Sequence, residues 1–116
     1  MSAVSKILSL LLVLVCVASA VMDFRRPAHL LADMQRLRIP ANKVPQLGVV
    51  KLVLAAGLLV GLKEVRVAEA SAAALSAYFA VATLTHTRVK DSFRQTAPAF
   101  ALLVVSVLCA LTTFAG

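Results

Sequence analysis

Three side chains could hydrogen-bond a ligand within apolar surroundings: Lys51, Tyr78 and His86. An ammonium, a phenol and an imidazole can each donate a hydrogen bond, and each stands within or at the end of an apolar stretch. The chemistry that these types suggest is recognition of the polar headgroup of a lipophilic molecule. We therefore take the three as candidate cofactor-binding residues for a quinone or a lipid headgroup, and expect no other cofactor.

Patterns that carry other chemistry are missing from the sequence. It has no glycine-rich phosphate loop, no nucleophile elbow and no pair of carboxylates. His86 has no histidine or carboxylate three or four residues away, and His29 lies in a different polar segment, so we expect no metal site. We also expect no catalytic residue and no catalytic activity of the chain's own.

The composition is that of a membrane protein. The chain is 61% hydrophobic and 15% charged, with a mean hydropathy of +0.95, whereas soluble domains are about 25% charged. The net charge of +7 is concentrated in short segments between apolar blocks, and no basic patch interleaves with aromatic residues. We therefore expect contact with a lipid bilayer and no nucleic-acid partner.

The apolar blocks predict an all-α polytopic membrane four-helix bundle, formed as one transmembrane domain over residues 1–116. About 20 apolar residues span a bilayer, which places the spans at about 3–22, 45–62, 67–87 and 97–115. Polar loops of about 23–44 and 88–96 join the first span to the second and the third to the fourth.

A short amphipathic helix is predicted within the first polar loop, between Pro27 and Pro40. Its apolar face would carry Leu30, Leu31 and Met34 with Leu37, and its polar face Arg26, His29 and Asp33 with Arg36. The alternative is a solvated loop with a single helical turn.

The first apolar block has two interpretations. Lys6, a short apolar core and Ala18-Ser19-Ala20 resemble a cleavable signal peptide. Arg25 and Arg26, directly after the block, resist translocation. We favour an uncleaved helix.

Lys51 lies about 9 Å inside the second span. A charge at mid-bilayer costs about 2.5–3.5 kcal/mol on insertion scales, so this lysine needs a partner or a route to the surface. The tight turn near residue 64 places Glu69 too far along the hairpin, which leaves Tyr78 and Ser76 as candidates. The alternatives are a lysine that snorkels to headgroups and a buried lysine that holds the bundle or meets a ligand.

Small residues predict close helix packing in the second and third spans. Gly57 and Gly61 form a GxxxG motif, and the third span is rich in alanine. We expect helix packing at Gly48, Gly57, Gly61, Ala73 and Ala77.

The two cysteines are not spaced as a redox pair. Cys16 and Cys109 are expected at depths that differ by about 9 Å, while a disulfide needs Cα atoms within about 7 Å. Both thiols are therefore expected to behave as small buried groups.

The loop charges predict the orientation. Eight of the 12 lysines and arginines lie in the two longer loops, and positive loops stay cytoplasmic. This places both termini of a multi-pass cell-membrane protein outside the cytoplasm.

The order of several short motifs resembles the DoxX-like family of small bacterial membrane proteins. The matching positions are Ile39-Pro40, Leu47-Gly48, Lys51, Gly57-Leu58-Leu59, Gly61, Ala82, Thr85-His86-Thr87-Arg88, Asp91 and Pro98-Ala99. The resemblance implies a four-helix membrane bundle without a soluble domain. The family takes its name from a membrane subunit of a thiosulfate:quinone oxidoreductase, and other relatives are linked to redox maturation or chaperone-like work. It leaves Lys51 and the segment His86 to Asp91 as functional candidates.

Two functions remain open from the sequence. The first is a non-catalytic membrane subunit or partner-binding bundle, with a membrane or redox protein or a second copy of the chain as partner. The second is a membrane component of a quinone-linked redox system, with a headgroup site near Lys51 and His86.

Overall fold

The computed structural model describes residues 1–115, and these form helices joined by short connections. The helices are α1 (Ala3–Arg25), α2 (Ala28–Arg36), the short 3-10 helix η1 (Ala41–Lys43), α3 (Val44–Gly61), α4 (Val65–Arg88) and α5 (Phe93–Ala115). Four of them, α1, α3 (extended by η1), α4 and α5, are long and apolar enough to cross a membrane. The predicted all-α membrane bundle is confirmed, and α2 is the predicted amphipathic helix.

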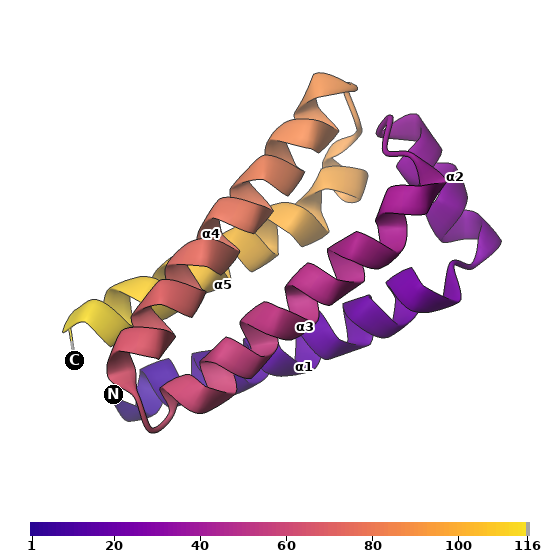
Figure 1. Cartoon of the computed structure of the whole chain (residues 1–116). Helices are drawn as coiled ribbons and strands as arrows, with labels where there is room; N and C mark the ends of the chain where they lie inside the picture. Colours follow the sequence, from indigo (N-terminus) through magenta and orange to yellow (C-terminus); the bar gives the residue numbers. More distant parts are fainter. Residues whose placement is uncertain (116) are drawn as a thin grey trace.

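The four long helices form a closed ring of neighbours. Helix α1 packs against α3 and α5, and α4 packs against the same two helices. The start of α1 and the end of α5 lie beside the turn between α3 and α4, while α2 lies at the opposite end with the α4–α5 connection (Figure 1). The longest extent of the bundle is 40 Å, enough to cross a hydrocarbon core of about 30 Å.

Contacts between the long helices bury a narrow core. Its residues are Leu12, Cys16, Ala55, Leu58, Ala72, Leu75, Phe79 and Cys109. At most 33% of the residues in the apolar stretch of each span are buried. Large side chains such as Val53, which is 62% exposed, lie on the outer surface. This distribution suits a bundle whose outer surface is covered by lipid tails.

Two helices end in the same backbone motif although neither has a glycine at the required position. After α2, Arg38 has φ 64°, and the N–H of Ile39 donates to the Met34 carbonyl at 2.8 Å. After α4, Lys90 has φ 57°, and the N–H of Asp91 donates to the His86 carbonyl at 3.1 Å. Both are Schellman motifs, which bring the side chains of the two bonded residues together.

The helix bounds differ from the predicted spans in two places that matter for the site. Helix α1 continues to Arg25, so Asp23 is helical rather than part of a loop. Helix α5 begins at Phe93, because Ser92 and Gln95 form a capping box with reciprocal backbone hydrogen bonds of 3.3 Å. Pro98 is therefore inside the helix rather than in its first turn.

Candidate functional site

A cavity of about 760 Å³ opens in the half of the bundle that carries α2. Its wall is mostly aliphatic, and all five α-helices contribute to it. Lys51, Tyr78 and His86, the three candidates from the sequence, all line it, together with the hydroxyl residues Ser19 and Thr85. The fold therefore brings the candidate residues of α3 and α4 to one shared space.

Lys51 is buried in an ion pair. Its Nζ donates to Asp23 Oδ2 at 2.8 Å and to Ser19 Oγ at 2.7 Å, and the side chains of Lys51 and Asp23 are only 9% and 2% exposed. The partner is thus a carboxylate of α1 and not Ser76, whose hydroxyl bonds the carbonyl of Ala72. The alternative in which Lys51 snorkels to headgroups is wrong for the same reason.

Asp23 was not identified from the sequence as the partner of Lys51, because the first span predicted from the sequence ends at residue 22. A signal was nevertheless present, since the buried residues of α1 recur every three or four positions and end at Asp23. They are Ser5, Ser9, Leu12, Cys16, Ala20 and Asp23. Extending this stripe by one turn would have placed the carboxylate on the core face, within the depth that Lys51 reaches.

Tyr78 lies beside the ion pair and also lines the cavity. Lys51 Nζ is 5.8 Å from the centre of its ring, a cation–π distance, and the ring stacks edge-on against Phe79 at 5.3 Å. Its hydroxyl has no hydrogen-bond partner within residues 1–115, although the side chain lines the cavity. The phenol is therefore a free donor beside an apolar wall.

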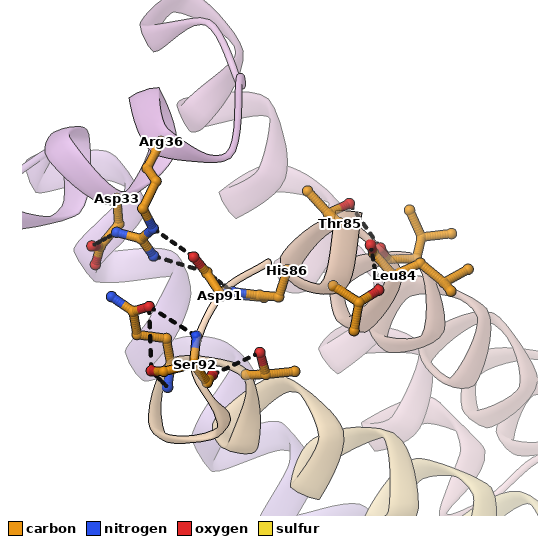
Figure 2. Close-up of polar contacts among 11 residues, drawn as sticks. Asp33, Arg36, Leu84, Thr85, His86, Asp91 and Ser92 are labelled. Carbon is orange, nitrogen blue, oxygen red and sulfur yellow. Dashed lines mark hydrogen bonds and ion pairs between the residues drawn. The ribbon is translucent and has the colours of Figure 1, made fainter. Parts of the chain in front are cut away.

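His86 belongs to a polar cluster at the end of α4 (Figure 2). Its Nδ1 lies 2.6 Å from Asp91 Oδ2, and Arg36 of α2 holds the same carboxylate through Nε at 2.8 Å and a second guanidinium nitrogen at 3.0 Å. The Schellman motif after α4 brings together His86 and Asp91, which are five residues apart in the sequence. A search of the sequence for a partner of His86 only three or four residues away therefore misses Asp91. Without a glycine, the sequence carried no clear signal for this motif.

Charge fixes the hydrogen bonds in this cluster. The hydrogen bonds from Arg36, and then that from His86, lower the pKa of Asp91, and those to Asp91 and Asp33 raise the pKa of Arg36. An ionised carboxylate only accepts, so His86 Nδ1 carries the proton that it donates. The Nε2 atom of the same ring bonds nothing among the described residues, and His86 lines the cavity.

The same cluster holds α2 over the cavity. Arg36 bonds Asp33 at 2.7 Å within α2 and Asp91 at 2.8 Å in the α4–α5 connection, and the second contact ties the polar face of α2 to that connection. The apolar face of α2 contributes Leu30 and Met34 to the cavity wall, and Leu37 follows. The amphipathic helix α2 thus forms part of the cavity wall at this end of the bundle.

The glycines predicted for helix packing lie at close approaches. A Cβ on Gly61 would be 2.5 Å from the Cβ of Ala68, and a Cβ on Gly57 would collide with the Ser71 hydroxyl. A Cβ on Gly48 would lie 3.2 Å from the Cβ of Asp23. Gly48 thus lets α1 approach α3 where the ion pair forms.

The two alanines predicted for packing are placed differently. Ala73 is exposed, and Ala77, also exposed, borders the cavity. Neither is buried between helices, because the small residues that α4 turns toward its neighbours are Ala68, Ser71 and Ala72.

The cysteines lie apart, and both are free and buried. Cys109 is within 3.4 Å of the Ser9 hydroxyl, about two helical turns from Cys16. No group of three metal-ligating side chains occurs in the part of the chain that the structure describes, and His29 is exposed.

Comparison with known proteins identifies the family. The family model for the DoxX-like family matches residues 7–109, a range that contains all of α2, α3 and α4 and every cavity residue. Comparisons with curated proteins and with solved structures found no match. The match covers most of the chain and agrees with the four membrane-spanning helices. The chain belongs to the DoxX-like family.

Proposed function

We propose that this membrane protein binds a lipophilic molecule with a hydrogen-bonding headgroup, of the quinone class, and serves as a non-catalytic membrane component of a redox system. The observation that carries the proposal is the common cavity, which combines an apolar wall with Lys51, Tyr78 and His86. Its volume of about 760 Å³ lies within the range of about 300–1,000 Å³ typical of small-molecule sites.

The three polar side chains have complementary roles toward such a headgroup. The Tyr78 hydroxyl donates to a carbonyl oxygen. His86, with Nδ1 held by Asp91, offers Nε2 as an acceptor for a hydroxyl when neutral and as a donor when protonated. Lys51 has one N–H left after bonding Asp23 and Ser19. The set could bind both a quinone and a quinol, in keeping with the redox context that the family resemblance implies.

Quinone binding to the purified protein tests the proposal. Protein extracted in mild detergent should contain quinone on organic extraction, and should bind added short-chain quinone. Tyr78→Phe should weaken that binding about 3- to 10-fold, the effect of one hydrogen bond of about 0.5–1.5 kcal/mol. Because the hydroxyl bonds no described residue, this change leaves the fold intact.

Ser76→Ala is the matched control. It removes a hydroxyl from the same helix, but this hydroxyl bonds its own backbone and does not line the cavity. Equal affinities for wild type and Tyr78→Phe would refute the assigned headgroup site. Absence of quinone binding together with a stable copurifying protein would favour a partner-binding bundle instead.

We also propose that the end of the bundle with α2 faces the cytoplasm. The segments Arg25 to Lys43 and Arg88 to Arg94 are at this end and contain eight basic residues, against Lys6, Lys63 and Arg66 at the other end. Basic loops are retained on the cytoplasmic side. A periplasm-active reporter fused after Gly116 should therefore be active, and a cytoplasm-active reporter should be silent; the reverse result would overturn the orientation.

A further inference from the structure

A second hollow, of about 450 Å³, adjoins the cavity at the α2 end of the bundle. Its lining is Leu37, Arg38, Ile39, Thr85, Arg88 and Val89. Leu37, Ile39 and Thr85 also line the large cavity, so the two spaces share a wall. An apolar space and a basic space therefore lie next to each other.

The two arginines in this hollow have no carboxylate partner. Within residues 1–115, neither Arg38 nor Arg88 lies in an ion pair, whereas Arg36 binds both Asp33 and Asp91. The acidic side chains of the neighbouring cluster are thus already engaged. Two exposed arginines without a carboxylate partner among the described residues border this hollow, and their positive charge favours an anion.

The backbone at Arg38 explains how this arginine comes to border the hollow. Its φ of 64° lies in the left-handed region, where glycine is the usual residue at this position of a Schellman motif. The conformation directs the chain so that Arg38 and Arg88 border one space, although they come from the ends of different helices.

We propose that Arg38 and Arg88 form a binding site for a phosphate group. The planar fork of an arginine matches a phosphate with two parallel hydrogen bonds. The phosphate could belong to an anionic lipid, whose acyl chain would enter the adjoining apolar space, or to a free phosphate ion. The two arginines are distinct from Lys51, Tyr78 and His86, which are assigned to the quinone headgroup, so failure of quinone binding leaves the phosphate site standing.

Native mass spectrometry of the detergent-purified full chain tests this site. Wild type should bind phosphatidylglycerol in preference to zwitterionic phosphatidylcholine. Arg38→Gln with Arg88→Gln should weaken phosphatidylglycerol binding about tenfold or more, because charge-assisted hydrogen bonds contribute about 1.5–3 kcal/mol each. If the change at Arg38 disturbs the end of α2, the single variant Arg88→Gln still tests the site, because Arg88 lies within a helix.

Arg25→Gln with Arg94→Gln is the matched control. Both arginines are exposed and line neither hollow, and their removal lowers the net charge equally. The proposal expects this pair to change affinity less than about twofold. Inorganic phosphate that binds by itself and displaces the lipid identifies the free ion as ligand, and lipid binding unaffected by phosphate identifies the headgroup. Equal losses in the two double variants, or no binding of either ligand, would overturn the site.

Discussion

Replacing Lys51 by methionine is predicted to destabilise the bundle strongly. The change keeps a long unbranched side chain but removes both hydrogen bonds of the ammonium, at 2.7 and 2.8 Å. Asp23, whose side chain is 2% exposed, would remain as a buried carboxylate without its counter-ion. Breaking a buried pair by removing one partner costs about 3–5 kcal/mol, and we expect a loss of this size in the free energy of unfolding.

A double-mutant cycle with Asp23→Asn isolates the pair. The asparagine keeps the shape of the side chain and carries no charge, so Lys51→Met with Asp23→Asn should recover most of the loss. Unfolding free energies measured by SDS titration in mixed micelles should yield a coupling of at least about 2 kcal/mol between the two sites. A snorkelling lysine would behave as a surface residue, with a loss within about 0.5 kcal/mol and additive effects, and that result would refute the ion pair.

Three further predictions concern other contacts. Gly61→Ala should lower the free energy of unfolding by about 1–3 kcal/mol through overpacking, since the added methyl would lie 2.6 Å from an α4 backbone carbon. Gly57→Ala should lower it less, because its methyl meets a serine hydroxyl that can rotate. SDS titration of the two variants compares these losses. The hydrogen bonds from the α2 arginine, and then that from the α4 histidine, lower the pKa of Asp91. Asp91 should therefore stabilise the docking of α2 fully at pH values above the ordinary aspartate pKa of about 3.9, and progressively less as the pH falls toward the lowered pKa. Hydrogen exchange of the α2 amides measures this pH dependence, which Asp91→Asn should abolish. Cys16 and Cys109 should resist maleimide until the protein is denatured, and a shift on a gel upon reduction would contradict their separation.

The fold could be predicted from the sequence because bilayer thickness limits the lengths of the apolar blocks. The amphipathic α2 could also be predicted, since Leu30, Met34 and Leu37 recur at helical spacing between two prolines. Exact helix ends could not, because they depend on local hydrogen bonds. The capping box at Ser92 starts α5 early and places Pro98 within it.

The candidate residues of the site could be named from their types, but their relations could not. Lys51, Tyr78 and His86 stand out as polar groups in apolar surroundings, and the structure places them around one cavity. Asp91 was a candidate only as part of the segment His86 to Asp91, without its partners, and Asp23 was not a candidate because it lies just past the expected end of the first span. The pairing across helices depends on how α1 is rotated about its axis, which no local pattern in α3 specifies.

The cavity is proposed to hold a lipophilic ligand beside Tyr78. Cross-linking with a photoactivatable quinone, followed by peptide mapping, tests it most directly. Adducts are expected at cavity-lining residues of α3 and α4, such as Lys51, Tyr78 and Ala82, and excess unlabelled quinone should suppress them. Adducts confined to outward-facing residues such as Val53 and Leu84, 62% and 61% exposed, and insensitive to competition, would contradict it.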